Sequence, residues 1–117
     1  MNVLITGTSA GIGFELVRKF LSYDHQVYAV TRNPKRLLQL AKTQPNLSVI
    51  DADINTVSGR KLIVKKLGKG THVDVLINNA GVLVNKAFPK ITEKELTSVY
   101  HTNVFAPFLL VQGLLPH

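Results

Sequence analysis

The sequence has no cysteine and no tryptophan among its 117 residues. Without cysteine the chain has no disulfide, no thiolate nucleophile and no cysteine-ligated zinc or iron–sulfur centre, which is typical of a protein from a reducing compartment. The four histidines are scattered along the chain and do not suggest a metal site. We therefore expect neither a structural nor a catalytic metal.

Long apolar runs are also missing. No stretch approaches the roughly 20 apolar residues of a membrane-spanning helix. The first residues, Met-Asn-Val-Leu-Ile-Thr-Gly, lack the basic leader and the length of a secretion signal. A hydrophobic content of 45% with 18% charged residues excludes disorder. The sequence predicts a soluble, cytoplasmic protein with one packed domain over residues 1–117 and no membrane partner.

Acidic residues are scarce, because seven of them face 14 lysines and arginines, which gives a formal net charge of +7. Part of this excess lies between Asp53 and Asp74, in a segment without any acid: Arg60, Lys61, Lys65, Lys66 and Lys69. A nucleic-acid-binding segment would favour aromatic residues between its basic residues, and this segment has none. The apolar residues Leu62, Ile63 and Leu67 fit the dry side of the same segment. We interpret the bases as the solvated face of a helix, and a nucleic-acid partner is disfavoured.

Short apolar, β-branched runs alternate with amphipathic segments along the chain. The runs span residues 3–6, 27–31, 47–51 and 73–78. They do not alternate strictly between apolar and polar residues, which is expected when helices cover both faces of a sheet. The sequence therefore predicts an α/β fold with a doubly wound parallel sheet, whose right-handed crossover connections contain the helices.

The expected helices carry recognisable end signals. Asn33-Pro34 opens one helix, which has ended by Pro45, and a third helix spans residues 57–67 and stops at Gly68. Gly59 inside this third helix is expected to weaken it by about 1 kcal/mol relative to alanine.

The last helix has the strongest start signal. Thr92 and Glu95 form a capping box, with Ile91 and Leu96 placed for a hydrophobic staple around it. We expect this helix to continue to about residue 115 with a bend at Pro107. From residue 99 onward it is apolar nearly all round, so it must be covered on more than one side, by its own sheet and by another helix, another chain or a missing part of the fold.

A glycine-rich segment follows the first run directly. Residues 6–13 read Thr-Gly-Thr-Ser-Ala-Gly-Ile-Gly and lead into a helix. Gly7 permits a sharp exit from the strand, Gly11 permits close approach of a pyrophosphate, and Gly13 permits close packing of the helix on the sheet. Backbone amides and the helix dipole would then face the phosphates. The candidate cofactor-binding residues here are Gly7, Thr8, Ser9, Gly11, Ile12 and Gly13.

A basic residue stands where many dinucleotide sites place an acid. About twenty residues after the glycines, where a carboxylate would bind the ribose hydroxyls of NAD, the sequence has Thr31 and Arg32, with Lys35 and Arg36 close behind. A guanidinium suits a 2′-phosphate through paired charge-assisted hydrogen bonds. Arg32 therefore favours NADP over NAD as the cofactor.

Two further strand ends carry polar residues. The third run ends in Asp51, with Asp53 two residues later. Either acid can serve an adenine amino group, with the next backbone amide donating to the ring, or cap the following helix. Residue type alone does not separate these roles; Asp53 and Ile54 are the cofactor-binding candidates. The fourth run ends in Asn78-Asn79-Ala80-Gly81. Asn79, Ala80 and Gly81 lie at the carboxyl edge, where open α/β sheets bind ligands.

Together these motifs resemble the short-chain dehydrogenase/reductase family, in its compact-subunit branch, and the resemblance covers the whole chain. The family's Thr-Gly-x-x-x-Gly-x-Gly matches residues 6–13, its Asn-Asn-Ala-Gly matches residues 78–81, and its strand-three acid matches Asp53. Segments 32–34, 45–47 and 106–107 are similar to carbonyl-reductase-like members. The resemblance implies a Rossmann-type domain, and it implies that Asn103, within His-Thr-Asn-Val, supports a catalytic proton relay.

The sequence also departs from the family pattern. Family members add a serine and a Tyr-x-x-x-Lys pair, but Tyr23, Tyr28 and Tyr100 are followed four residues on by Val27, Arg32 and Val104. The resemblance therefore implies the amino-terminal half of a reductase, truncated before its catalytic segment and incompetent alone. Four strands in the order 3-2-1-4 would leave the fourth as an exposed edge.

The leading hypothesis is the NADP-binding part of an oxidoreductase that moves a hydride between NADPH and a small carbonyl compound or alcohol. The alternative is a non-catalytic nucleotide-binding or subunit-interaction module. In the family the last helix builds a subunit interface, so a homo-oligomer through that helix is expected.

Overall fold

A computed structural model gives the structure of residues 1–115, with four parallel strands in one sheet. The strands are β1 (Asn2–Thr6), β2 (Gln26–Thr31), β3 (Leu47–Asp51) and β4 (Val75–Ile77). Their order is β3-β2-β1-β4, so β1 lies in the centre and pairs in parallel with both β2 and β4. The predicted parallel, doubly wound sheet and its strand order are confirmed.

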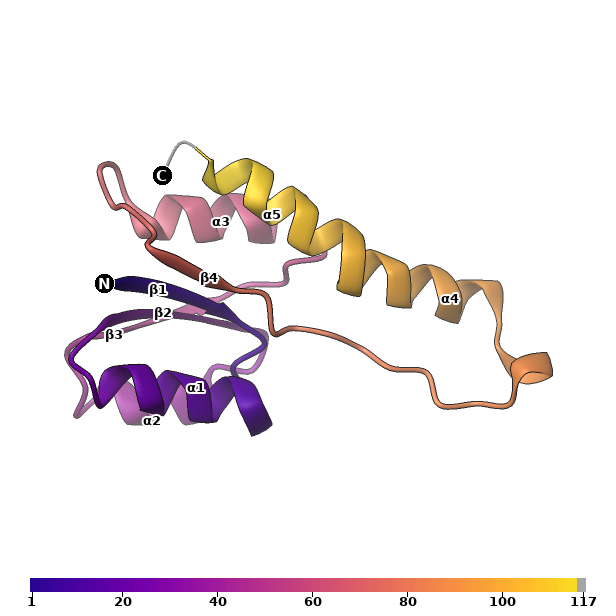
Figure 1. The fold of residues 1–117 in the computed structure, drawn as a ribbon, viewed down its shortest axis with the longest axis horizontal. Helices are drawn as coiled ribbons and strands as arrows, with labels where there is room; N and C mark the ends of the chain where they lie inside the picture. Colours follow the sequence, from indigo (N-terminus) through magenta and orange to yellow (C-terminus); the bar gives the residue numbers. More distant parts are fainter. Residues whose placement is uncertain (116–117) are drawn as a thin grey trace.

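Helices cover both faces of this sheet (Figure 1). Helices α1 (Gly11–Leu21) and α2 (Lys35–Ala41) lie on one face, and α3 (Val57–Leu67) and α5 (Ala106–Leu114) lie on the other. Neighbouring residues of β1 enter different cores, because Val3 packs in the α1–α2 layer and Leu4 packs in the α3–α5 layer. This two-sided burial explains why the strands are apolar without strict alternation.

Helix α3 has the bounds that the sequence predicts, but the expectation for Gly59 is wrong. The helix begins after Thr56, whose hydroxyl accepts a hydrogen bond from the Gly59 amide at 2.9 Å. A Cβ atom placed on Gly59 would lie 2.0 Å from the backbone oxygen of Asp53. Glycine is therefore the residue that lets α3 pack against the preceding loop, and alanine would not strengthen this helix.

The last helical segment begins as predicted and is irregular in its middle. After a 3-10 turn, η1 (Phe88–Lys90), helix α4 (Glu93–Tyr100) starts with the expected capping box between Thr92 and Glu95. A π-helical turn, η2 (His101–Phe105), then connects α4 to α5. Pro107 has no amide hydrogen to donate to the fourth residue before it, which accounts for an irregular turn just ahead of the proline.

Strand β4 is shorter than the predicted segment 73–78. Its three residues pair only with β1, and all three are half-buried, as expected for an edge strand. Beyond Ile77 the backbone no longer pairs with β1. The side-chain amide of Asn79 instead donates a hydrogen bond to the Thr6 backbone oxygen at 3.0 Å. A side-chain hydrogen bond therefore replaces the last backbone pairing.

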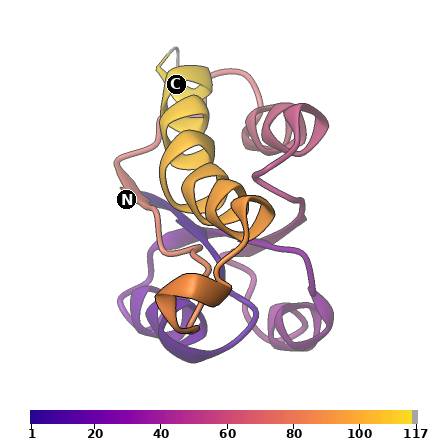
Figure 2. The ribbon, with the colours of Figure 1, turned by 90° about the vertical axis from the view of Figure 1, so that its right-hand side faces the viewer.

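Helices α4 and α5 expose a continuous series of large apolar side chains, here called the α4–α5 apolar face. Helix α4 projects beyond the sheet, as Figure 1 shows, and its projecting end faces the viewer in Figure 2. The face consists of Leu96, Tyr100, Val104, Phe105, Phe108, Val111 and Leu115, all exposed. No helix within residues 1–115 has the length and apolarity needed to cross a membrane.

Candidate functional site

The glycine-rich loop between β1 and α1 makes the close approaches that its glycines suggest. A Cβ on Gly7 would lie 2.6 Å from the Cα of Ala80, and one on Gly13 would lie 2.2 Å from the Gly7 oxygen. Gly7 and Gly11 have φ values of +69° and +57°, which favour glycine. No atom lies within 4 Å of a Cβ on Gly11, so the backbone there is open to a ligand. The loop is therefore packed tightly at Gly7 and Gly13 and left accessible at Gly11.

Thr8 and Ser9 have different surroundings within this loop. Thr8 is buried, and both its hydroxyl and its amide donate to the backbone oxygen of Val30, at 2.9 and 3.2 Å. Ser9 is exposed and lines the cavity described below. The Thr8 side chain therefore holds the loop against β2.

The Asn78–Gly81 segment at the end of β4 is fastened to the end of β1. Asn79 donates its amide hydrogens to the backbone oxygens of Thr6 and Gly7, at 3.0 and 2.9 Å, and the Ala80 amide donates to the Thr6 hydroxyl at 3.1 Å. These bonds bring the segment against the glycine-rich loop. They also place it at the point where the strand order reverses, between β1 and β4.

A cavity of about 280 Å³ lies at the carboxyl ends of the strands. It unites most of the candidate residues, which come from four separate loops: Gly7, Ser9, Arg32, Asp53, Ile54, Asn79, Ala80 and Gly81. Seven further lining residues were not among the candidates: Val30, Thr31, Asn33, Ala52, Asn55, Val82 and Thr102. All of them except Val30 adjoin a candidate in the sequence, and Thr102 adjoins Asn103 in the π turn η2.

Arg32 is distinguished from its basic neighbours by this cavity. Its exposed side chain follows β2 and lines the cavity, whereas Lys35 and Arg36 do not. The Arg36 guanidinium instead stacks on the Phe14 ring, 3.6 Å from its centroid. The ion pairs within residues 1–115 do not involve Arg32. Its charge is therefore available to an anionic ligand.

The two acids at the carboxyl end of β3 have different surroundings. Thr56, not an aspartate, caps helix α3. Asp53 lines the cavity and accepts a hydrogen bond from the Asn55 amide at 2.9 Å through one carboxylate oxygen, whereas Asp51 is exposed and outside the cavity. The adjacent Asn55 buries its side-chain oxygen without a hydrogen-bond partner in the described part of the chain. Such an oxygen calls for a donor from water or a ligand.

Asn103 lies in the π turn η2 and contacts the loop after β4. Its side-chain oxygen accepts from the Val82 amide at 2.8 Å, and its amide group donates to the Val82 oxygen at 2.9 Å. Asn103 therefore fixes the backbone that follows Gly81. It does not itself line the cavity.

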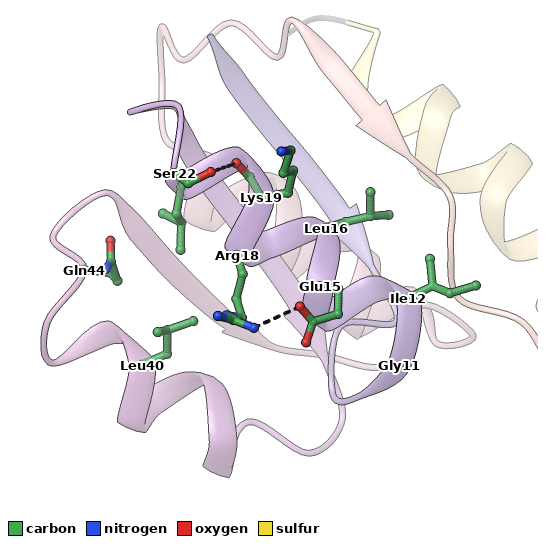
Figure 3. A pocket seen from close by; sticks show the side chains of 10 residues that line it. Gly11, Ile12, Glu15, Leu16, Arg18, Lys19, Ser22, Leu40 and Gln44 are labelled. Carbon is green, nitrogen blue, oxygen red and sulfur yellow. Dashed lines mark hydrogen bonds and ion pairs between the residues drawn. The ribbon is translucent and has the colours of Figure 1, made fainter.

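A larger groove of about 940 Å³ runs along the outer side of α1 toward α2 (Figure 3). Gly11 and Ile12 lie at one end of it, and Leu40 and Gln44 come from α2 and the loop after it. Its Glu15 carboxylate is paired with Arg18 at 3.0 Å. The groove does not contain the strand-end residues, so we place the candidate site in the smaller cavity.

The residues present fit a dinucleotide. Gly7 and Ser9 of the glycine-rich loop, the Arg32 guanidinium after β2 and the Asp53 carboxylate after β3 surround one cavity at the switch point of the sheet. The accessible Gly11 lies outside this cavity, at the N-terminus of α1 and the end of the larger groove. No cluster of three possible metal ligands occurs among residues 1–115. The fold is a Rossmann-type α/β fold.

Comparison with known proteins identifies the family. A family model described as short chain dehydrogenase matches residues 1–117. The chain belongs to the short-chain dehydrogenase/reductase family. It is 30% identical to an L-xylulose reductase of Caenorhabditis elegans over 94% of this chain and 45% of that protein. It is 36% identical to the uncharacterized oxidoreductase DltE of Bacillus subtilis over 98% of this chain and 47% of the relative. The chain therefore spans about half the length of these curated relatives.

Solved structures agree with this assignment. An NADPH-bound carbonyl reductase from chicken fatty liver superposes with a TM-score of 0.93 at 33% identity, covering 98% of this chain and 50% of that one. A serine dehydrogenase complexed with NADP+ gives a TM-score of 0.89 at 27% identity, over 99% of this chain and 48% of that one. A 4-hydroxyisoleucine dehydrogenase mutant complexed with NADH gives 0.88 at 25% identity, over 97% and 47%. The family thus includes users of both nicotinamide cofactors.

Proposed function

We propose that this chain forms the NADP-binding part of an oxidoreductase that transfers a hydride between NADPH and a small carbonyl compound or alcohol. The observation that carries the choice of NADP is Arg32. It lines the cavity at the end of β2, is free of ion pairs within residues 1–115, and stands next to Thr31 and Asn33 rather than an acid. A 2′-phosphate at this strand end would meet a cation and no repelling carboxylate.

Each strand end has a proposed part in binding. The amides around Gly11, at the N-terminus of α1, hold the pyrophosphate, with Ser9 beside them. Asp53 and the Ile54 amide contact the adenine, and residues 79–81 line the ribose side. The bound cofactor supplies the hydride, and the chain's residues hold and orient it.

The proton-transfer group of the family is absent from these residues. None of the three tyrosines has a lysine four positions later. Asn103 would support the proton relay by fixing the Val82 backbone. We therefore propose that residues 1–117 alone do not turn over. Reproducible NADPH consumption by the pure chain with carbonyl substrates would overturn this statement.

The cofactor proposal is tested by replacing Arg32 with alanine. Loss of charge-assisted hydrogen bonds, worth about 1.5–3 kcal/mol, is expected to weaken NADPH binding by about 10- to 100-fold and NADH binding much less. Lys35→Ala is the matched control, because Lys35 is exposed and outside the cavity. Titration calorimetry with both cofactors measures the difference. Equal weakening of NADPH and NADH would show that Arg32 does not meet the 2′-phosphate.

A subunit-interaction role is the second candidate, and the α4–α5 apolar face favours it. Phe105 and Phe108 in this face are 52% and 68% exposed. Exposed apolar surface of this kind marks an interaction site. We propose that α4 and α5 form an oligomer contact, in a homo-oligomer or with a full-length relative. Sedimentation equilibrium of the chain and of Phe108→Ser tests this, and a dilute, stable monomer of the unmodified chain would contradict it.

A further inference from the structure

The loop between β3 and α3, here called the 53–55 loop, is held at three successive backbone oxygens. The Thr56 hydroxyl donates to the Asp53 oxygen at 3.0 Å, and the Arg60 guanidinium donates to the Ile54 oxygen at 2.7 Å. The third contact joins the Nε2 atom of His101 to the Asn55 oxygen at 3.0 Å. With all three oxygens engaged, the peptide planes of this loop have little freedom to rotate.

The contact from His101 differs in origin from the other two. Thr56 and Arg60 belong to helix α3 and its cap, so they move with the loop. His101 lies 46 residues beyond Asn55, in the π turn η2, and therefore fixes the loop relative to another part of the fold. Because a backbone oxygen only accepts hydrogen bonds, the Nε2 atom must carry the hydrogen. The ring is half-buried and packs edge-on to Phe105, with centroids 6.1 Å apart.

The same π turn also holds the opposite side of the cavity. Asn103 binds both polar groups of the Val82 backbone, and Thr102 between the two residues lines the cavity itself. One helical turn thus sets the spacing between the 53–55 loop and the loop after β4. A residue placed in this way acts on ligand binding without touching the ligand.

We propose that His101 is a positioning residue for the adenosine side of the cofactor. By donating from Nε2 to the Asn55 oxygen, it holds the Asp53 carboxylate and the Ile54 amide in the orientation that binds adenine. This inference rests on the proposed NADP-binding function. It assigns a role to a side chain that neither lines the cavity nor bears on the hydride transfer.

The test compares two substitutions that differ in one property. His101→Gln keeps a nitrogen donor at similar reach, whereas His101→Leu removes it and keeps an apolar contact for Phe105. The matched control is His25→Leu, since the His25 ring also packs on aromatic rings, those of Phe20 and Tyr23, beside the amino end of β2, at the edge opposite the cavity. The probe is adenosine 2′,5′-bisphosphate, which carries the adenine and the 2′-phosphate alone.

Because His101→Leu loses one hydrogen bond to the 53–55 loop, its affinity for this probe is expected to be about three- to tenfold lower than that of the unmodified chain. His101→Gln is expected to bind within about twofold of the unmodified chain, and His25→Leu is expected to bind unchanged. A purely structural role would lower the melting temperature of His101→Leu and leave its affinity intact. Equal affinity in His101→Leu and the unmodified chain, or no rescue by His101→Gln, overturns the proposal.

A second readout needs no ligand. Nitrogen NMR of the neutral His101 ring is expected to show the hydrogen on Nε2. Hydrogen exchange of the Asn55 amide, which bonds to Asp53, is expected to be about three- to tenfold faster in His101→Leu. If the unmodified chain does not bind the probe, the NADP proposal fails. Hydrogen exchange of the Asn55 amide then remains as the test of whether His101 holds the 53–55 loop. Equal exchange in both chains then overturns the role of His101.

Discussion

Replacing Gly59 with alanine separates helix propensity from close packing, because the two effects have opposite signs at this position. In an open helix, alanine is more favourable than glycine by about 0.8–1.0 kcal/mol. At Gly59 the new Cβ would lie 2.0 Å from the Asp53 oxygen and 2.8 Å from the Thr56 hydroxyl oxygen that caps α3. Overpacking of this kind costs about 1–3 kcal/mol, and we expect Gly59→Ala to lie toward the upper end of this range because the contact is with a backbone oxygen. We expect a net loss of about 1–2 kcal/mol in the free energy of unfolding.

Gly113→Ala in α5 is the matched control, since its Cβ would meet only the Val64 side chain, at 3.6 Å. This variant is expected to gain up to about 1 kcal/mol. Urea unfolding of both variants and the unmodified chain, at one protein concentration, measures the differences from midpoints at equal slope. If Gly59→Ala stabilises the chain as Gly113→Ala does, the close approach of α3 to the 53–55 loop is refuted.

Three further changes test other contacts. Gly13→Ala is expected to abolish NADPH binding, because the new Cβ would lie 2.2 Å from the Gly7 oxygen and force α1 away from the loop; unaltered binding in a calorimetric titration would contradict this. Asn79→Asp removes the donor to the Thr6 and Gly7 oxygens and is expected to lower the free energy of unfolding by about 1–3 kcal/mol. Asn78→Asp is the control in the same urea assay, and it is expected to be nearly neutral because Asn78 is exposed. Hydrogen bonds to the Glu95 carboxylate, the largest effect from Lys86 and smaller ones from the amide and the hydroxyl of Thr92, lower the pKa of Glu95 from 4.5 to about 2. The stability that the Glu95 carboxylate contributes is therefore complete above about pH 4.5 and is lost as the pH falls toward 2. Carbon NMR titration of Glu95 measures this pKa, which Lys86→Ala should raise.

Sequence patterns predicted the features that depend on local chemistry. The capping box of α4 needs only Thr92 and Glu95, three residues apart, and it forms as expected. The four strands follow from short apolar runs between helical segments, and the strand order follows from the doubly wound topology. Arg32 could be identified as a cofactor-binding candidate because one helix and one strand, α1 and β2, fix the number of residues between the glycine-rich loop and the end of β2.

Features that depend on contacts between distant residues were not predictable in this way. Gly59 resembles an ordinary weak point in a helix until the Asp53 oxygen is placed beside it. The contact of Thr8 with β2 has no sequence signal either, because its hydroxyl donates to the oxygen of Val30, 22 residues away. The π turn has no composition signal of its own, and Pro107 indicated only that some irregularity was due.

The central position of β1 has a consequence for the order of folding. All of its neighbours are parallel, so no strand pair can form as a local hairpin. Strand β2 follows β1 closely in the chain, but the Leu4 partner in β4 is Leu76, so β4 is recruited across a much longer loop. Asn79 reaches the Thr6 and Gly7 oxygens only when β4 has docked. We therefore expect the glycine-rich loop, although it precedes the other motifs in this sequence, to be among the last to become rigid.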